Sequence, residues 1–138
     1  QGFMAEANLS DNVRFIESLL IEELRTLYAM AHLSILSSIP GANQVEGFGI
    51  VLVEANLMGT AVIGARNGGI VDAIGDGESG LLYAPGDADD LAQKVIHLLS
   101  NDELREKMGQ DGRARALRGY TWDIVAAKTW QAIQSGLV

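Results

Sequence analysis

Two glutamates, Glu46 and Glu54, stand at the ends of the segment EGFGIVLVE, which has the pattern of a glycine-containing loop entering a helix. Because a helix rises about 1.5 Å per residue, the two carboxylates can lie at most roughly 12 Å apart, a distance comparable with the length of an extended nucleotide-diphosphate sugar. The start of the helix offers unpaired backbone N–H groups that suit a phosphate. Carboxylates accept hydrogen bonds from sugar hydroxyls. The spacing therefore indicates a site that binds a diphosphate between two hydroxylated rings.

A second interpretation of the same spacing stays open. Glu46 can be a solvated loop residue and Glu54 an exposed helix residue, with the glycines only shaping a turn. The residues around Glu54 favour the site, because they are apolar nearly all round the helix and predict that it is buried on most sides. A carboxylate in such a helix needs a partner or an opening to a cleft. The apolar residues are Val51, Leu52, Val53, Ala55, Leu57 and Met58.

Short apolar runs alternate along the chain with segments of helical periodicity. We expect strands at residues 13–16, 33–36, 60–64 and 81–83. We expect helices at residues 21–30, 49–58, 70–74, 88–99, 102–117 and 122–133. Gly59 is expected to close the second of these helices and Asn101 to cap the fifth.

This alternation, with short glycine-rich turns, indicates right-handed βαβ units and a parallel sheet. The predicted fold class is α/β, a Rossmann-like doubly wound parallel sheet. Ligands bind such sheets beyond the carboxyl ends of the strands, and residues 37–49 and 65–69 are loops that each follow a strand. We therefore expect five residues of these loops to surround one cleft: Glu46, Phe48, Gly49, Gly68 and Gly69.

The predicted sheet is incomplete. Only about four strands are found, and the chain opens almost directly on one of them, whereas doubly wound nucleotide domains usually have more. No G-x-G-x-x-G run follows a first strand, so a dinucleotide fold of the dehydrogenase type has no support. We expect the chain to be the latter part of a larger unit.

Composition limits the classes of function. The 138 residues fit one domain, residues 1–138, and the net charge of −8 argues against broad contact with nucleic acid or an anionic membrane. The chain has no cysteine and only two histidines, so we expect no metal site, and a cytoplasmic location is compatible with the missing cysteines. No apolar run approaches the roughly 20 residues of a transmembrane segment.

The last predicted helix carries apolar residues along one face. Two tryptophans belong to this face, which predicts a core or docking surface in preference to a ligand platform. The face comprises Trp122, Val125, Ala126, Thr129, Trp130 and Ile133.

The segment from Glu46 to Ala55 resembles the E-x7-E signature of the retaining glycosyltransferases of family 4, which have the GT-B fold. Further segments resemble that family and follow in its order, so the resemblance covers nearly the whole chain. They are residues 13–16, 23–24, 27–29, 59–63, 68–72, 76–82 and 85–87, followed by the terminal helices from 98 to 122.

The resemblance implies roles for both glutamates. Glu54 corresponds to the carboxylate that binds the ribose hydroxyls of the donor nucleotide, and Glu46 to the catalytic residue that faces the transferred sugar. Such enzymes retain the sugar's configuration and need no bound metal or other cofactor, since the nucleotide-diphosphate sugar is a co-substrate. Catalysis then rests on electrostatic stabilisation of the departing diphosphate, and Glu46 need not be a covalent nucleophile.

The resemblance also implies contacts for the rest of the donor. The backbone of Phe48, Gly49, Ile50 and Val51 would bind the sugar hydroxyls and the distal phosphate. The nucleobase would lie near Phe15, Ile16 and Leu24, a weaker correspondence. Arg66 is interpreted as a solvated loop residue in preference to a phosphate ligand.

By this resemblance the chain is part of a C-terminal donor-binding domain. The first strands with their arginine and lysine clamp, and the N-terminal acceptor domain, are expected in a longer protein. That protein would transfer a hexose from a donor such as GDP-mannose or UDP-glucose to an acceptor hydroxyl, whereas the isolated chain would be inactive. We expect a cytoplasmic protein, with the missing domain as a means of peripheral membrane contact.

A standalone nucleotide-sugar binding or assembly module on a degenerate transferase fold is the alternative, and the intact pair Glu46 and Glu54 disfavours it. A sugar-nucleotide epimerase has no support in the order of the motifs. An incomplete sheet exposes a strand edge, so self-association of the chain is also expected.

Overall fold

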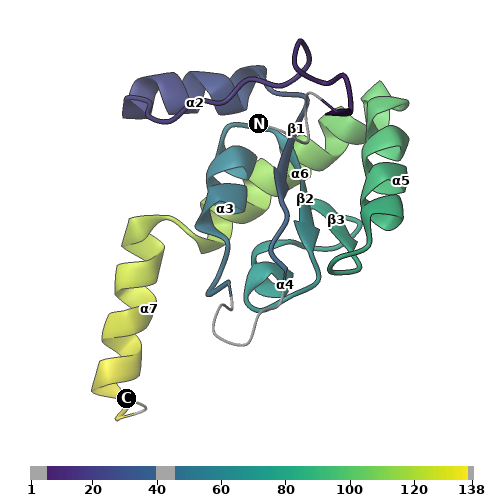
Figure 1. The fold of residues 1–138 in the computed structure, drawn as a ribbon. Helices are drawn as coiled ribbons and strands as arrows, with labels where there is room; N and C mark the ends of the chain where they lie inside the picture. Colours follow the sequence, from purple (N-terminus) through teal and green to yellow (C-terminus); the bar gives the residue numbers. More distant parts are fainter. Residues whose placement is uncertain (1–5, 40–45, 137–138) are drawn as a thin grey trace.

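The computed structural model describes residues 6–39 and 46–136 and has an α/β fold (Figure 1). Three strands form its sheet: β1 (Leu33–Leu36), β2 (Ala61–Ala65) and β3 (Gly80–Tyr83). The helices are α2 (Ile21–Met30), α3 (Ile50–Leu57), α4 (Ile70–Ala73), α5 (Ala88–Leu99), α6 (Asp102–Gly119) and α7 (Trp122–Gln134).

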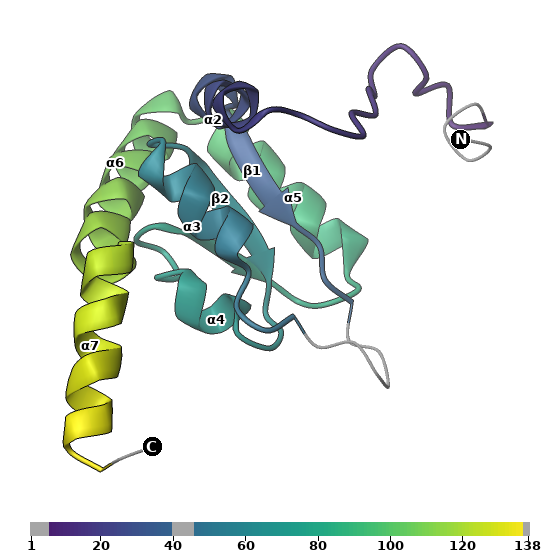
Figure 2. The same cartoon turned by 90° about the vertical axis from the view of Figure 1, so that its left-hand side faces the viewer.

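The strands run parallel in the order β1-β2-β3, so the predicted parallel sheet is confirmed. Helix α3 covers one face of the sheet and α5 the other, as the two perpendicular views show (Figures 1 and 2). All five residues of β2 are buried, as expected for a central strand covered on both faces. The core around it includes Leu52, Val62, Ile63, Ile70 and Leu98.

The strand predicted at residues 13–16 is wrong. This segment has no regular structure, and Phe15 and Ile16 are exposed. A strand satisfies its N–H and C=O groups only through a neighbouring strand, and none of the described residues pairs with this segment. A short apolar run is therefore not enough to form a strand here, because no neighbouring strand among the described residues pairs with it.

Most residues of α3 are buried or partly buried but one side of the helix is open, so the prediction that this helix is buried on most sides holds only in part. Leu52, Val53, Ala55 and Asn56 are buried, but Ile50, Val51 and Met58 are exposed. The helix packs against β1, β2 and α6, with α2 near it, and these neighbours leave part of its surface open. The open part carries Ile50 and Val51, which belong to the segment between Glu46 and Glu54.

Helix α6 approaches α3 and β2 very closely. An added Cβ at Gly109 would lie 2.0 Å from the carbonyl oxygen of Gly59, and one at Gly112 would lie 2.4 Å from Nδ2 of Asn56. That amide is buried and donates hydrogen bonds to the carbonyl oxygens of Thr60 (3.0 Å) and Ser79 (3.1 Å). The two glycines thus let α6 support α3 at van der Waals contact.

Helix α7 extends away from the sheet (Figures 1 and 2), and none of its residues is buried. Trp122 is 81% exposed and Trp130 is 60% exposed, which excludes a core role for the pair within the described part of the chain. No described helix combines the length and the apolar character that crossing a membrane requires.

Candidate functional site

The segment that starts at Glu46 forms a tight entrance to α3. Gly49 has φ +76°, a left-handed conformation, and an added Cβ there would lie 3.1 Å from Leu36 and 3.3 Å from Ile70. The carboxylate of Glu46 accepts a hydrogen bond of 3.1 Å from the N–H of Gly49. One oxygen of Glu46 is therefore fixed at the start of the helix, where the first N–H groups have no partner within the helix.

The loop after β2 meets the loop after β1. The N–H of Gly69 donates to the carbonyl oxygen of Glu46 at 3.0 Å, and an added Cβ at Gly69 would lie only 2.0 Å from the carbonyl oxygen of Gly47. The two loops thus lie together as predicted, but the five residues expected around one cleft do not share it, because only Phe48 of the five lines the cavity beside the loops. The meeting of the loops follows from the parallel sheet, because both loops leave its carboxyl edge.

A cavity of about 820 Å³ opens beside this entrance. Its walls come from α2, from α3 with Phe48, and from the junction of α6 and α7. Glu54 is partly buried and lines it, whereas Glu46, Gly49, Gly68 and Gly69 do not. The two glutamates therefore present different environments: Glu46 lies at the helix entrance, and Glu54 lies in the wall of the cavity.

Glu54 has a neighbour in this wall. The hydroxyl of Tyr28 donates to Oε2 of Glu54 across 3.5 Å, a long hydrogen bond. Burial raises the pKa of Tyr28, and the negative charge of Glu54 and the hydrogen bond raise it further. The Tyr28 hydroxyl therefore stays protonated and remains a donor, which leaves Glu54 further capacity to accept hydrogen bonds.

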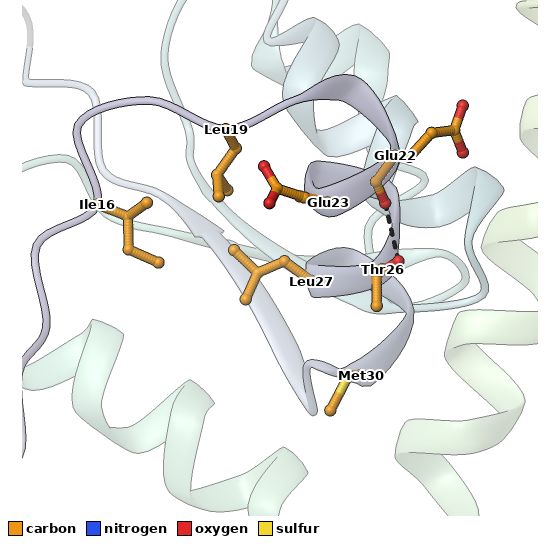
Figure 3. Close-up of a pocket in the computed structure, with 7 residues that line it drawn as sticks. All are labelled: Ile16, Leu19, Glu22, Glu23, Thr26, Leu27 and Met30. Carbon is orange, nitrogen blue, oxygen red and sulfur yellow. Dashed lines mark hydrogen bonds between the residues drawn. The ribbon is translucent and has the colours of Figure 1, made fainter.

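The structure separates the residues predicted near a nucleobase. Leu24 lines the cavity together with Glu54. Phe15 lies outside it and is 64% exposed. Ile16 lines a different pocket with Leu27 on the outer side of α2, shown in Figure 3. Only Leu24 is brought to the cavity of Glu54.

Several cavity residues were missed by sequence reasoning. Tyr28 lies one helical turn after Leu24 on the same face of α2, and this spacing could have indicated it. Tyr120 contacts Phe48 with ring centroids 5.4 Å apart, a contact that no local pattern indicates. Two cationic side chains, Arg25 and Lys128, also line the cavity.

Arg66 does not line the cavity of Glu54. It forms an exposed ion pair with Asp76 at 2.6 Å, which agrees with its interpretation as a solvated loop residue. Burial alone would raise the pKa of Asp76, but hydrogen bonds from the Leu82 N–H and from Arg66, with the charge of Arg66, hold it below its ordinary value. Among the described residues, no group of three or more His, Cys, Asp or Glu side chains could hold a metal ion.

Comparison with known proteins identifies the family. Residues 1–115 match the family model of the glycosyl transferases group 1. The chain is 35% identical over 130 residues to the MMP alpha-(1->4)-mannosyltransferase of Mycolicibacterium hassiacum, covering 94% of this chain and 30% of that relative. It is 36% identical over 128 residues to the D-inositol 3-phosphate glycosyltransferase of Corynebacterium efficiens, covering 93% and 29%.

The solved structures agree with this match. Sucrose-phosphate synthase from Thermosynechococcus elongatus superposes with a TM-score of 0.87 at 30% identity, covering 99% of this chain and 33% of that one. The chain thus spans about 30% of the length of the curated relatives that it matches. Its α/β fold is that of the GT-B glycosyltransferases. From the matched family model and these relatives, the chain belongs to the group 1 glycosyltransferases.

Proposed function

We propose that this chain forms the donor-binding part of a retaining glycosyltransferase, which transfers a hexose from a nucleotide-diphosphate sugar to an acceptor hydroxyl. The observation that carries the proposal is the arrangement around α3. The carboxylate of Glu46 accepts a hydrogen bond from the Gly49 N–H at the start of α3. Glu54, on α3, lines a cavity of about 820 Å³ beside that start. A cavity of this volume is of the size that binds small-molecule ligands.

In this proposal Glu54 binds the ribose of the donor. Its carboxylate lies in the cavity wall with the apolar side chain of Leu24 and the hydroxyl of Tyr28. A carboxylate has two oxygens that accept hydrogen bonds, so it can hold a pair of neighbouring hydroxyls while Tyr28 holds one of its oxygens in place. The apolar surface of Leu24 suits the edge of a nucleobase.

Glu46 would face the transferred sugar. Its bond to the Gly49 N–H fixes the carboxylate, and its own carbonyl is fixed by the Gly69 N–H. A fixed carboxylate stabilises the positive charge that develops on a sugar ring as the bond to the leaving diphosphate breaks. The N–H groups at the start of α3, which have no partner within the helix and belong to its first residues Ile50 and Val51, favour the negative charge of the departing group.

The donor sugar and nucleotide are proposed from the names of the relatives. The relatives named above include a mannosyltransferase and an inositol-phosphate glycosyltransferase. We therefore propose a mannose or glucose donor linked to GDP or UDP. The acceptor-binding domain and the cations that neutralise the diphosphate would belong to the remainder of a longer protein, as would any contact with a membrane, and no bound metal would be needed.

The experiment is a transfer assay on the full-length protein. UDP-glucose and GDP-mannose are supplied with a panel of hydroxyl acceptors, and the anomeric configuration of the product is determined by NMR. Glu46→Gln should lower kcat by about a hundredfold or more, as loss of one electrostatic stabiliser does elsewhere. Glu106→Gln, at an exposed glutamate on α6, is the matched control and should leave turnover unchanged.

Three results would contradict the proposal. An inverted product would refute the retaining mechanism, and full turnover by Glu46→Gln would refute the role of that carboxylate. Binding of a nucleotide sugar without any transfer would favour a standalone binding module instead.

A further inference from the structure

The short helix α4 is held at its carboxyl end by residues from α6 and its terminus. Arg115 donates from its two terminal nitrogens to the carbonyl oxygens of Ala73 and Asp72, each at 2.9 Å. The hydroxyl of Tyr120 donates to the same Asp72 carbonyl at 2.8 Å. The planar guanidinium thus binds two successive carbonyls, which fixes both the position and the direction of the end of α4.

The same two residues are linked by contacts to the segment from Glu46 to Gly49 that leads into α3, called here the motif loop. The guanidinium of Arg115 lies over the ring of Tyr120, 5.1 Å from its centroid, and that ring contacts Phe48 with centroids 5.4 Å apart. Phe48 and Tyr120 also pack against a small cluster of buried residues, Val53 of α3, Ala73 of α4 and Ala116 of α6. Arg115 therefore orients Tyr120, and Tyr120 supports Phe48.

The amino end of α4 returns to the same loop. The Gly69 N–H donates to the Glu46 carbonyl, and the backbones of Gly69 and Gly47 are in direct contact. Helix α4 is thus bound to the motif loop at one end and to Arg115 and Tyr120 at the other. Since Tyr120 contacts Phe48, these contacts form a closed ring in which the residues from Glu46 to Phe48 are one side.

We propose that Arg115 and Tyr120 are positioning residues that fix the carboxylate of Glu46 through α4 and Phe48. The segment needs such support because Gly49 has a left-handed conformation and Gly47 has no neighbour within 4 Å of an added Cβ. Arg115 lies outside the cavity of Glu54, whereas Tyr120 forms part of its wall. The consequence for sugar transfer rests on the proposed function, but the structural claim does not.

The first test measures amide hydrogen exchange by NMR on this chain. Tyr120→Leu and Arg115→Gln should each speed exchange of the Gly49 and Gly69 amides by at least about tenfold, because both hydrogen bonds depend on the ring of contacts. The amide of Ile63, in the buried strand β2, reports global unfolding and should exchange at the wild-type rate. Tyr120→Phe keeps the ring and loses only the hydroxyl, so it should give a smaller change.

Arg113→Gln is the matched control, because Arg113 lies on the same helix, is exposed, and has no ion pair or side-chain hydrogen bond among the described residues. Unchanged exchange at Gly49 and Gly69 in both test variants would overturn the proposal. Equal acceleration at Ile63 would also overturn it, since it would show a general loss of stability.

The second test measures the kinetics of the full-length protein. Arg115→Gln should lower kcat by about tenfold or more while the dissociation constant for the nucleoside diphosphate stays within twofold, because neither Arg115 nor its hydrogen-bond partners on α4 line the cavity that contains Glu54. Wild-type kcat with Arg115→Gln would overturn the catalytic consequence. If the wild-type protein transfers no sugar, the proposed function fails, and the exchange experiment still decides whether Arg115 and Tyr120 position the loop.

Discussion

Replacing Gly69 by alanine tests the contact between the two loops. The backbone of Gly69, with φ −75° and ψ −4°, suits alanine, so without a clash this change would stabilise the protein by about 0.4–1 kcal/mol. The added Cβ would lie 2.0 Å from the Gly47 carbonyl oxygen and 2.7 Å from Cα of Phe48. These are backbone atoms, so no side-chain rotation relieves the clash, and the loops must move apart by about 1 Å.

The cost can be derived from this movement. Overpacking at a well-packed site costs about 1–3 kcal/mol, and loss of the bond from the Gly69 N–H to Glu46 adds about 0.5–1.5 kcal/mol. With the gain of about 0.4–1 kcal/mol subtracted, we expect Gly69→Ala to lower the free energy of unfolding by about 0.5–4 kcal/mol, or the Tm by roughly 2–16 °C.

The assay is urea unfolding of this chain followed by circular dichroism. Gly119→Ala is the matched control, since an added Cβ at Gly119 meets no atom within 4 Å and alanine favours the helix. The two substitutions should therefore change stability in opposite directions. Wild-type stability or a gain for Gly69→Ala would refute the reasoning about the two loops.

Three further predictions follow from individual contacts. Tyr28→Phe should raise the donor KM of the full-length protein several-fold with little change in kcat, because it removes only the hydroxyl beside Glu54; an unchanged KM would argue against that role. The pKa of Asp76 is lowered in the folded protein, so its stabilisation is present above its ordinary pKa of about 3.9 and is lost as the pH falls through the lower folded value. Acid titration of stability should therefore show a smaller loss below about pH 4 in Asp76→Asn than in the wild type. Gly109→Ala should destabilise the chain by about 1–3 kcal/mol in urea unfolding, since its Cβ would meet the Gly59 carbonyl oxygen at 2.0 Å.

Features coded by local signals were predicted well from the sequence. Helix α2 and the strand β1 have the predicted bounds, and Asn101 caps α6 by accepting from the Leu104 N–H at 3.0 Å. Periodicity and capping depend on residues a few positions apart, so they are visible in the sequence. The strand at residues 13–16 failed because pairing depends on a distant partner.

The candidate site was predictable to a similar extent. The meeting of Glu46 with Gly69 follows from the rule that parallel strands end at one edge of a sheet. Contacts made by Arg115 and Tyr120 span more than 40 residues and depend on how α6 packs, which no local pattern specifies. The roles of the individual residues stay predictions, because they concern a bound donor.

The central claim is that Glu54 binds the donor nucleotide, and calorimetric titration of the full-length protein with UDP and GDP tests it most directly. A hydrogen bond to a charged group contributes about 1.5–3 kcal/mol, so Glu54→Gln should raise the dissociation constant of the preferred nucleotide by about 10–100-fold. Glu106→Gln should bind it as the wild type does. Equal affinity of Glu54→Gln and the wild type would contradict the donor site proposed here.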